Sequence, residues 1–216
     1  LTRIARFVGV ALDNNDRPVD LGGVGATSRG VPGSARPRLR SPRVPAGVEE
    51  ALADSERILH DQTVQAADFP SQLVVTFSGN IPTFPSHGKA WFIVTLEIPG
   101  LVGQISASHL GASGSTSGFS TVVYLDGIVQ LVGAKATFTI DKNFVTEIRR
   151  KTNSPAAMNL LCRVTVKCDF LLDSNGKAVD GNHLGGTLPS GDGVPGGDFE
   201  SWFTVTIPPS PAGPVN

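Results

Sequence analysis

Alternating apolar and polar residues predict that most of this chain forms β-strands. The clearest case is the segment 158–172, where Arg163, Thr165, Lys167 and Asp169 lie on one face and apolar residues lie on the other. The apolar face of that segment comprises Leu160, Cys162, Val164, Val166, Cys168, Phe170 and Leu172. Shorter patterns of the same kind predict further strands at 1–12, 73–77, 90–98, 120–132, 136–140 and 201–207.

Turn-forming residues separate these strands and indicate one all-β domain. The 216-residue chain holds 25 Gly and 16 Pro, a share well above the roughly 12% typical of globular proteins. Hydrophobic residues at 40% and charged residues at 17% indicate a folded chain. We therefore expect an immunoglobulin-like β-sandwich over 69–208, followed by a tail at 209–216.

The last strand is strongly patterned although it lies at the end of the chain. Gly196 and Gly197 allow a sharp turn before it, and aromatic and β-branched residues then alternate with threonines. We expect this terminal strand to pair between two earlier strands and so to close the core.

The segment 13–47 follows the N-terminal strand at 1–12 and has no sustained period of 2 or 3.6. Its prolines forbid a helix and favour an extended path, so we predict an extended Pro/Gly/Arg-rich N-terminal arm. The next residues, 48–62, have apolar positions at helical spacing and predict one short amphipathic helix. Only 142–151 has a pattern that could add another helix.

The arm carries a cluster of arginines, although the whole chain has a formal net charge of −1. The cluster contains no acid and comprises Arg29, Arg36, Arg38, Arg40 and Arg43. Such a cluster can bind phosphates, anionic lipid or an acidic protein face, or can lie in a solvated linker. It lacks aromatic residues to stack on bases, so nucleic acid is not the expected partner.

The two cysteines, Cys162 and Cys168, fall on the apolar face of the longest predicted strand. Six residues of strand separate them by roughly 20 Å, too far for a disulfide between them. We expect both to be small core residues, and they do not decide the compartment.

Acidic residues gather towards the end of the chain, and one group resembles a calcium loop in composition. In DSNGKAVD, residues 173–180, the oxygen-bearing Asp173, Asn175 and Asp180 surround Gly176. The bidentate glutamate of such a loop is missing, and Asn-Gly between apolar runs is a strong hairpin signal. The sequence favours the hairpin, and a calcium site completed by Asp192 or Asp198 is the alternative.

No other motif predicts chemistry. The serine-rich segment 111–118, near His109, lacks the spacing of a nucleophile elbow. The four histidines are isolated along the sequence, and no phosphate-binding loop, dinucleotide fingerprint or paired zinc-ligand motif occurs. We therefore expect no enzymatic activity and no cofactor other than the calcium alternative.

The run DFLLDSNGKAVDGNHLGGTLPSGDGVPGGDFESWFTV, residues 169–205, resembles the end of immunoglobulin-like modules in uncharacterised bacterial surface and secreted proteins. The resemblance covers about the last 40 residues. It implies a sandwich fold and an extracellular or cell-surface location, and it implies no reaction.

Together these patterns favour a structural subunit that self-assembles into a filament, sheath, shell or surface layer. We expect the arm to contact neighbouring copies, with arginines opposite the C-terminal carboxylates and apolar residues as anchors. The residues expected at this interface are Arg36, Arg38, Leu39, Arg40, Arg43 and Val44. The alternative is a secreted recognition module that binds carbohydrate or protein through loops, where Phe84 is the exposed aromatic candidate. No apolar run reaches the ~18 residues of a membrane helix.

Overall fold

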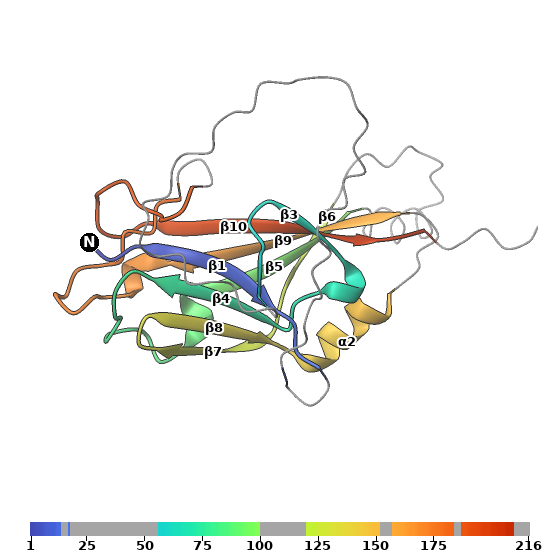
Figure 1. The fold of residues 1–216 in the computed structure, drawn as a ribbon, viewed down its shortest axis with the longest axis horizontal. Helices are drawn as coiled ribbons and strands as arrows, with labels where there is room; N and C mark the ends of the chain where they lie inside the picture. The colour runs from blue at the N-terminus through green and yellow to red at the C-terminus, as the bar shows by residue number, and fades with distance from the viewer. Residues whose placement is uncertain (14–16, 18–55, 100–119, 152–156, 184–186, 210–216) are drawn as a thin grey trace, which may run out of the picture.

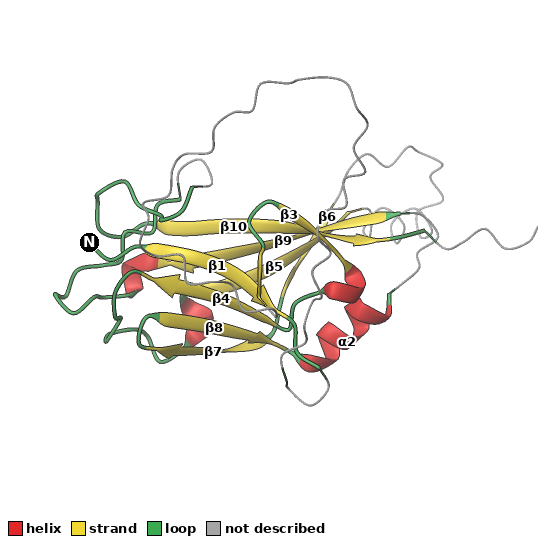
Figure 2. Cartoon of the chain, in the orientation of Figure 1, coloured by secondary structure: helices red, strands yellow, loops and turns green. Residues whose placement is uncertain are grey.

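The computed structural model describes residues 1–13, 17, 56–99, 120–151, 157–183 and 187–209. In this part of the chain two β-sheets face each other as two layers, with one α-helix at one end and long loops at the other (Figures 1 and 2). The expectation of an all-β sandwich is confirmed. No helix in these ranges is long and apolar enough to cross a membrane.

The first sheet has five strands in the order β2-β1-β4-β8-β7, and every neighbouring pair is antiparallel. Its strands are β1 (Ile4–Val10), β2 (Glu56–Ile58), β4 (Gln72–Phe77), β7 (Gly127–Val132) and β8 (Lys135–Ile140). The N-terminal strand is therefore an interior strand of the sandwich, between β2 and β4.

The second sheet has five strands in the order β3-β10-β9-β5-β6. Its strands are β3 (Gln62–Gln65), β5 (Phe92–Pro99), β6 (Ser120–Tyr124), β9 (Met158–Lys167) and β10 (Asp198–Ile207). The last strand, β10, pairs antiparallel with β9 and parallel with β3. The expected insertion of the terminal strand between two earlier ones is confirmed.

The core lies between the sheets and is built from the inward residues of both. Along β10, for example, Phe199, Phe203 and Val205 are fully buried and alternate with partly exposed residues. The rings of Phe92 on β5 and Phe138 on β8 stack across the layers with centroids 5.5 Å apart. The alternation in the sequence thus translates into one shared core.

A helix at one end of the sandwich confirms the pattern at 142–151. Helix α2 (Lys142–Arg150) begins after Asp141, whose carboxylate accepts the backbone N–H groups of Asn143 and Phe144. Near its other end, Arg149 donates to the carbonyl oxygens of Phe69 and Leu12. The described residues also form three short 3-10 helices: η1 (Ala66–Asp68), η2 (Gly88–Ala90) and η3 (Cys168–Phe170).

The strand predicted at 120–132 is in fact two strands in different sheets. The chain leaves β6 in the second sheet, passes through the buried Leu125, and enters β7 in the first sheet. The alternation continues through the crossing because both edges bury one face, and periodicity alone does not show which sheet a strand joins.

The strand predicted at 158–172 ends early. Residues Cys168–Phe170 turn into η3, which shifts the alternation, so Phe170 is exposed and Leu171 is buried. The facing prediction is confirmed from Leu160 to Cys168 and is wrong for Phe170. The 3-10 turn changes which face each side chain takes because its period is about three residues.

The helix predicted at 48–62 is also wrong in its described part. Glu56–Ile58 forms β2, and Gln62–Gln65 forms β3. Pairing with the strands β1 and β10 overrides a weak helical pattern here. The first part of the predicted helix, residues 48–55, lies outside the described residues.

The pairing of β1 with β2 places the predicted arm between two neighbouring strands of the first sheet. Val10 is directly opposite Glu56, so the chain leaves the first sheet after β1 and returns to it on the adjacent strand. The Pro/Arg-rich segment therefore connects two paired strands of one sheet. The sandwich correspondingly begins at β1, well before residue 69.

The core position of β9 gives a direct test of this facing. Val164 is fully buried, whereas its neighbour Thr165 faces outward and is partly exposed. Val164→Asp should lower the free energy of unfolding by several kcal/mol because it buries an unpaired carboxylate. Thr165→Asp should cost far less. Urea unfolding of both variants tests this, and equal or reversed losses would contradict the assigned faces.

Candidate functional site

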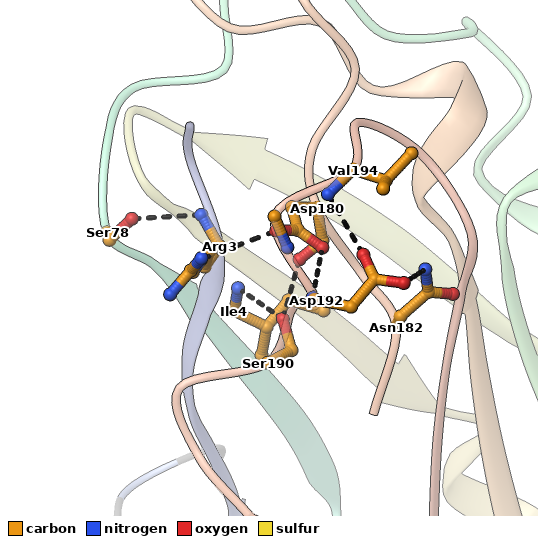
Figure 3. A network of polar contacts seen from close by, with 9 residues as sticks. Arg3, Ile4, Ser78, Asp180, Asn182, Ser190, Asp192 and Val194 are labelled. Carbon is orange, nitrogen blue, oxygen red and sulfur yellow. Dashed lines mark hydrogen bonds and ion pairs between the residues drawn. The ribbon is translucent and has the colours of Figure 1, made fainter. Parts of the chain in front are cut away.

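A polar network lies at the loop end of the sandwich, beside the N-terminus. It joins the start of β1 to two parts of the segment between η3 and β10, one around Asp180 and the other around Ser190 (Figure 3). Its centre is Asp180, whose side chain is 0% exposed. Because a buried carboxylate is costly without partners, its contacts decide what this site can do.

The Asp180 carboxylate has three described partners. Asp192 N–H donates to Oδ1 at 3.0 Å, and Gly193 N–H donates to Oδ2 at 2.9 Å. The guanidinium of Arg3 lies 3.4 Å from Oδ2 through its Nε and is 39% exposed. The charge is thus compensated by one cation and two backbone dipoles, as a structural ion pair requires.

Backbone contacts fix the same residues around Ser190. Ile4 N–H donates to Ser190 Oγ at 2.9 Å, and Ser190 Oγ donates to the carbonyl oxygen of Asp180 at 2.8 Å. Asp180 N–H in turn donates to the carbonyl oxygen of Thr2 at 2.8 Å. The network therefore fastens the first residues of the chain to a loop that precedes its last strand.

One glycine makes this close packing feasible. Gly191 has a positive φ of 110°, which side-chain-bearing residues rarely adopt. A Cβ atom there would collide with the Asp180 carboxylate and crowd Arg3 Nε. The backbone approaches the buried charge only because residue 191 has no side chain.

Two of the predicted calcium ligands, Asp173 and Asp180, accept backbone N–H groups in the structure. Asp173 Oδ1 accepts the N–H groups of Asn175 and Lys177, and these bonds hold the pKa of Asp173 below its usual value, that of Lys177 most strongly. Asp180 is committed to the network described above. No group of metal-binding side chains suited to a metal ion occurs among the described residues.

The same residues do form the predicted hairpin. Asp173 N–H donates to Lys177 O at 2.8 Å, Gly176 adopts a φ of 70°, and Leu172 and Ala178 form an antiparallel bridge. Asp192, the proposed completing ligand, instead accepts from Asn182 Nδ2 at 3.0 Å and from Val194 N–H at 2.9 Å. Asp198 pairs with Lys167.

A second polar group brings together two histidines that are far apart in the sequence. The rings of His60 and His183 meet edge to face with centroids 4.8 Å apart, and Trp202 covers His60 at 5.0 Å. His60 Nδ1 shares a hydrogen bond of 2.8 Å with Ser201 Oγ, and Trp202 Nε1–H donates to Asp61 Oδ1 at 3.2 Å. This histidine cluster lies where the chain enters β3.

The Ser201–His60 contact has the groups of a nucleophile and a base, but its burial argues against catalysis. Ser201 is 1% exposed and its side chain lies on the core-facing side of β10. A nucleophile needs room for the substrate next to its oxygen and donors for the developing charge. The contact is better explained as a buried hydroxyl satisfied by an imidazole.

The neutral form of His60 is favoured in the folded protein. Burial lowers the pKa of His60 most, the nearby His183 lowers it further, and Asp61 opposes both. The ring of His183 is fixed by Nδ1–H, which donates to Glu200 O at 2.6 Å. Protonation of His60 would therefore place a charge beside another imidazole in a partly desolvated site.

Both cysteines are buried free thiols, and no disulfide links them. Burial raises the pKa of Cys168 to about 12 and raises the pKa of Cys162 as well. The prediction of small core residues agrees with these positions. Neither sulfur is accessible as a thiolate for redox chemistry or metal binding.

The predicted interface residues Arg36, Arg38, Leu39, Arg40, Arg43 and Val44 lie outside the described residues, as do His109 and the serine-rich segment 111–118. The carboxylates expected to receive the arginines are described, and most have partners within the chain. In that group Asp169, Asp192 and Glu200 are exposed and Asp198 is half-buried, while Asp173 and Asp180 are buried. The expected pairing can therefore involve only part of the acidic group.

Sequence reasoning missed both polar groups because each depends on long-range pairing. His60 meets Ser201 since β3 runs parallel to β10, and no local pattern reports a parallel neighbour. The sharp clue to the Asp180 network was its surroundings, in which several glycines lie close to an aspartate. Local patterns identify those glycines only as turn residues.

Comparison with known proteins adds no assignment: no family model, no curated protein and no solved structure matches the chain. The function must therefore be argued from the geometry alone.

The Asp180 network should contribute more through the carboxylate than through the arginine. Asp180→Ala removes the acceptor of the Asp192 and Gly193 N–H groups and the partner of Arg3, and should lower the free energy of unfolding by about 2–4 kcal/mol. Arg3→Gln removes a partly exposed cation and should cost less than about 1 kcal/mol at moderate salt. Urea unfolding at pH 7 measures both, and a larger loss for Arg3→Gln would contradict this ranking.

The histidine cluster should make the fold sensitive to mild acid. Because the folded-state pKa of His60 is lowered, the unfolded chain binds more protons as pH falls below about 6.5. The stability contributed by neutral His60 is therefore complete above that pH and is lost as pH falls through the folded pKa. The midpoint temperature of thermal unfolding should decrease as the pH is lowered from 7 to 5. His60→Gln should reduce this dependence of the midpoint on pH.

Asp192→Asn serves as the control because it should change the pH dependence of stability only at a lower pH. Hydrogen bonds from Val194 and Asn182 lower the pKa of Asp192 below 3.8, so its contribution is lost only as pH falls below about 4. A His60→Gln variant with an unchanged slope between pH 7 and 5 would show that His60 is not the acid-sensitive group.

Proposed function

We propose that this protein is a non-enzymatic structural subunit that self-assembles into a filament, sheath, shell or surface layer. The observation that carries the proposal is the exposed edge strand β7. Its outward side chains include Ile128 and Val132, which are 68% and 76% exposed. From Gly127 to Ala134 the strand and its turn contain no charged residue and no proline.

Open edges of this kind favour association between chains. Natural sheets block their edges with charges, prolines, bulges or covering segments because unpaired backbone groups attract other strands. β7 carries neither charge nor proline, which is explained if the edge is covered by a partner in the working assembly. On the edge of the other sheet, β6 likewise exposes Val122 and Tyr124.

The long connection between β1 and β2 supplies a second means of contact. Both of its ends are fixed in the first sheet, and Arg149 binds the carbonyl oxygen of Leu12 at 3.0 Å where the connection begins. The contour length of residues 11–55 allows this connection to extend roughly 70 Å from the sheet and to return to it. An anchored loop can contact a neighbouring copy through its arginines without strand exchange.

The strand order supports the proposed immunoglobulin-like topology. The run β1-β4-β8-β7 corresponds to the order A-B-E-D of such sandwiches, and β10-β9-β5-β6 corresponds to G-F-C-C′. Modules of this shape are common in cell-surface proteins, which agrees with an extracellular or surface location. Fold-level analogy of this kind does not identify an activity.

A recognition module is the second candidate function. Phe84, in the loop before η2, and Phe170, in η3, both have exposed side chains. The bridge between Thr83 and Leu172 places the two loops side by side. Exposed aromatic residues on adjacent loops are typical of sites that bind carbohydrate or protein.

The mass of particles in solution tests the proposed function. The intact chain should form species larger than a dimer at micromolar concentration. A variant in which Asn-Gly replaces residues 13–54 should remain folded by circular dichroism, because Val10 and Glu56 already face each other. That variant should reach no more than dimer mass.

Two results would contradict this role. An intact chain that stays monomeric at all concentrations would favour the recognition module instead. A shortened chain that still forms the full-sized particles would show that the connection is not a contact between copies.

A further inference from the structure

The free edge of β7 has an identifiable set of unpaired backbone groups. On β8, Thr139 lies directly opposite Ile128 of β7. The N–H of the next residue, Ile140, points away from β7 and donates to Ser71 O at 3.0 Å. Asp141 N–H donates to Asp126 O at 2.9 Å. Because backbone groups alternate along an antiparallel strand, the even-numbered residues of β7 bond to β8.

The odd-numbered residues Gly127, Val129 and Leu131 therefore direct their N–H and C=O groups away from the sheet. Among the described residues no backbone hydrogen bond connects this side of β7 to another element. The 3-10 helix η2 packs against the inward face instead, where Gly88 contacts the side chain of Val129. In the described part of the chain the edge is thus open in the plane of the sheet.

The other sheet edges are less suited to pairing with a second chain. β7 has six residues, whereas β2 has three, β3 has four and β6 has five. β2 also contains Glu56 and Arg57. An uncharged strand of this length offers the longest ladder without bringing like charges together.

The residue order of β7 is self-complementary about Gln130. In an antiparallel pair of two β7 strands centred there, Ile128 lies opposite Val132 of the second copy, and Gln130 lies opposite itself. Val129 and Leu131 of the two copies exchange backbone hydrogen bonds. The exposed side chains then occupy the non-hydrogen-bonded pairs, where side chains pack closest.

From this geometry we infer that β7 pairs with β7 of a second copy of this chain about a two-fold axis at Gln130, which joins the two first sheets into one continuous sheet. The inference rests on the proposed function and names its partner and register. A two-fold contact is closed at two copies, so growth beyond a dimer requires a second contact. The connection between β1 and β2 is the segment that supplies it.

Cysteine cross-linking tests the register directly. Gln130→Cys should form a disulfide-linked dimer under mild oxidation, because the Cα atoms of opposite residues in a non-hydrogen-bonded pair lie about 4.5 Å apart. Ile128→Cys alone should not, since its twin lies roughly 13 Å along the ladder. An equal mixture of the Ile128→Cys and Val132→Cys chains should form linked heterodimers. The native thiols are buried and should not interfere.

Val194→Cys, at an exposed position in a loop, is the matched control for random collision. Linkage of Gln130→Cys no faster than that of Val194→Cys would overturn the inference. In a parallel experiment, Ile128→Lys should weaken dimerisation by tenfold or more, because two new ammonium groups enter the interface. Val194→Lys should leave the particle mass unchanged.

The outcomes separate the two proposals. Large particles without specific linkage at residue 130 would leave self-assembly standing and refute the β7 pairing. Particle mass that stays monomeric in the unmodified chain would refute both.

Discussion

The insertion of β10 between β9 and β3 is the interaction on which the rest of the structure depends. The strand contributes Phe199, Phe203, Val205 and Ile207 to the core and pairs along its whole length with β9. It also gives β3 a partner, which places His60 against Ser201. The loops that lead into β10 carry Asp180 and Ser190, so the same strand positions the network that holds the start of β1. Strands β1 and β10 are thus bound into one core and one polar network.

Two parts of the molecule are not explained by the insertion of β10. The connection between β1 and β2 is far longer than any hairpin needs, although its ends face each other in register. The edge strand β7 lacks the charges and prolines that normally protect an edge. In the proposed assembly, the two-fold pairing of edges would make a closed dimer and the long connection would link dimers.

Local patterning predicted a large part of the fold and almost none of the site. Alternation located β4, β8, β9 and β10, because burial of one face leaves a direct mark on the sequence, and the pattern at 142–151 located helix α2. It did not distinguish β6 from β7, since a strand crossing between sheets keeps its period, and it assigned helix to β2, whose structure comes from pairing with β1. Both polar groups join residues more than one hundred positions apart, and the exposed edge of β7 follows from sheet order. Such features depend on topology, which one sequence does not display.

Amide hydrogen exchange along β7, measured residue by residue at rising protein concentration, tests the account most directly. The amides of Val129 and Leu131 point to the open edge and should exchange quickly in the dilute protein and slowly in the assembled one. Those of Ile128 and Gln130 already bond to β8 and should change far less. Fast exchange at Val129 and Leu131 at concentrations where the particle mass has risen would contradict pairing through this strand.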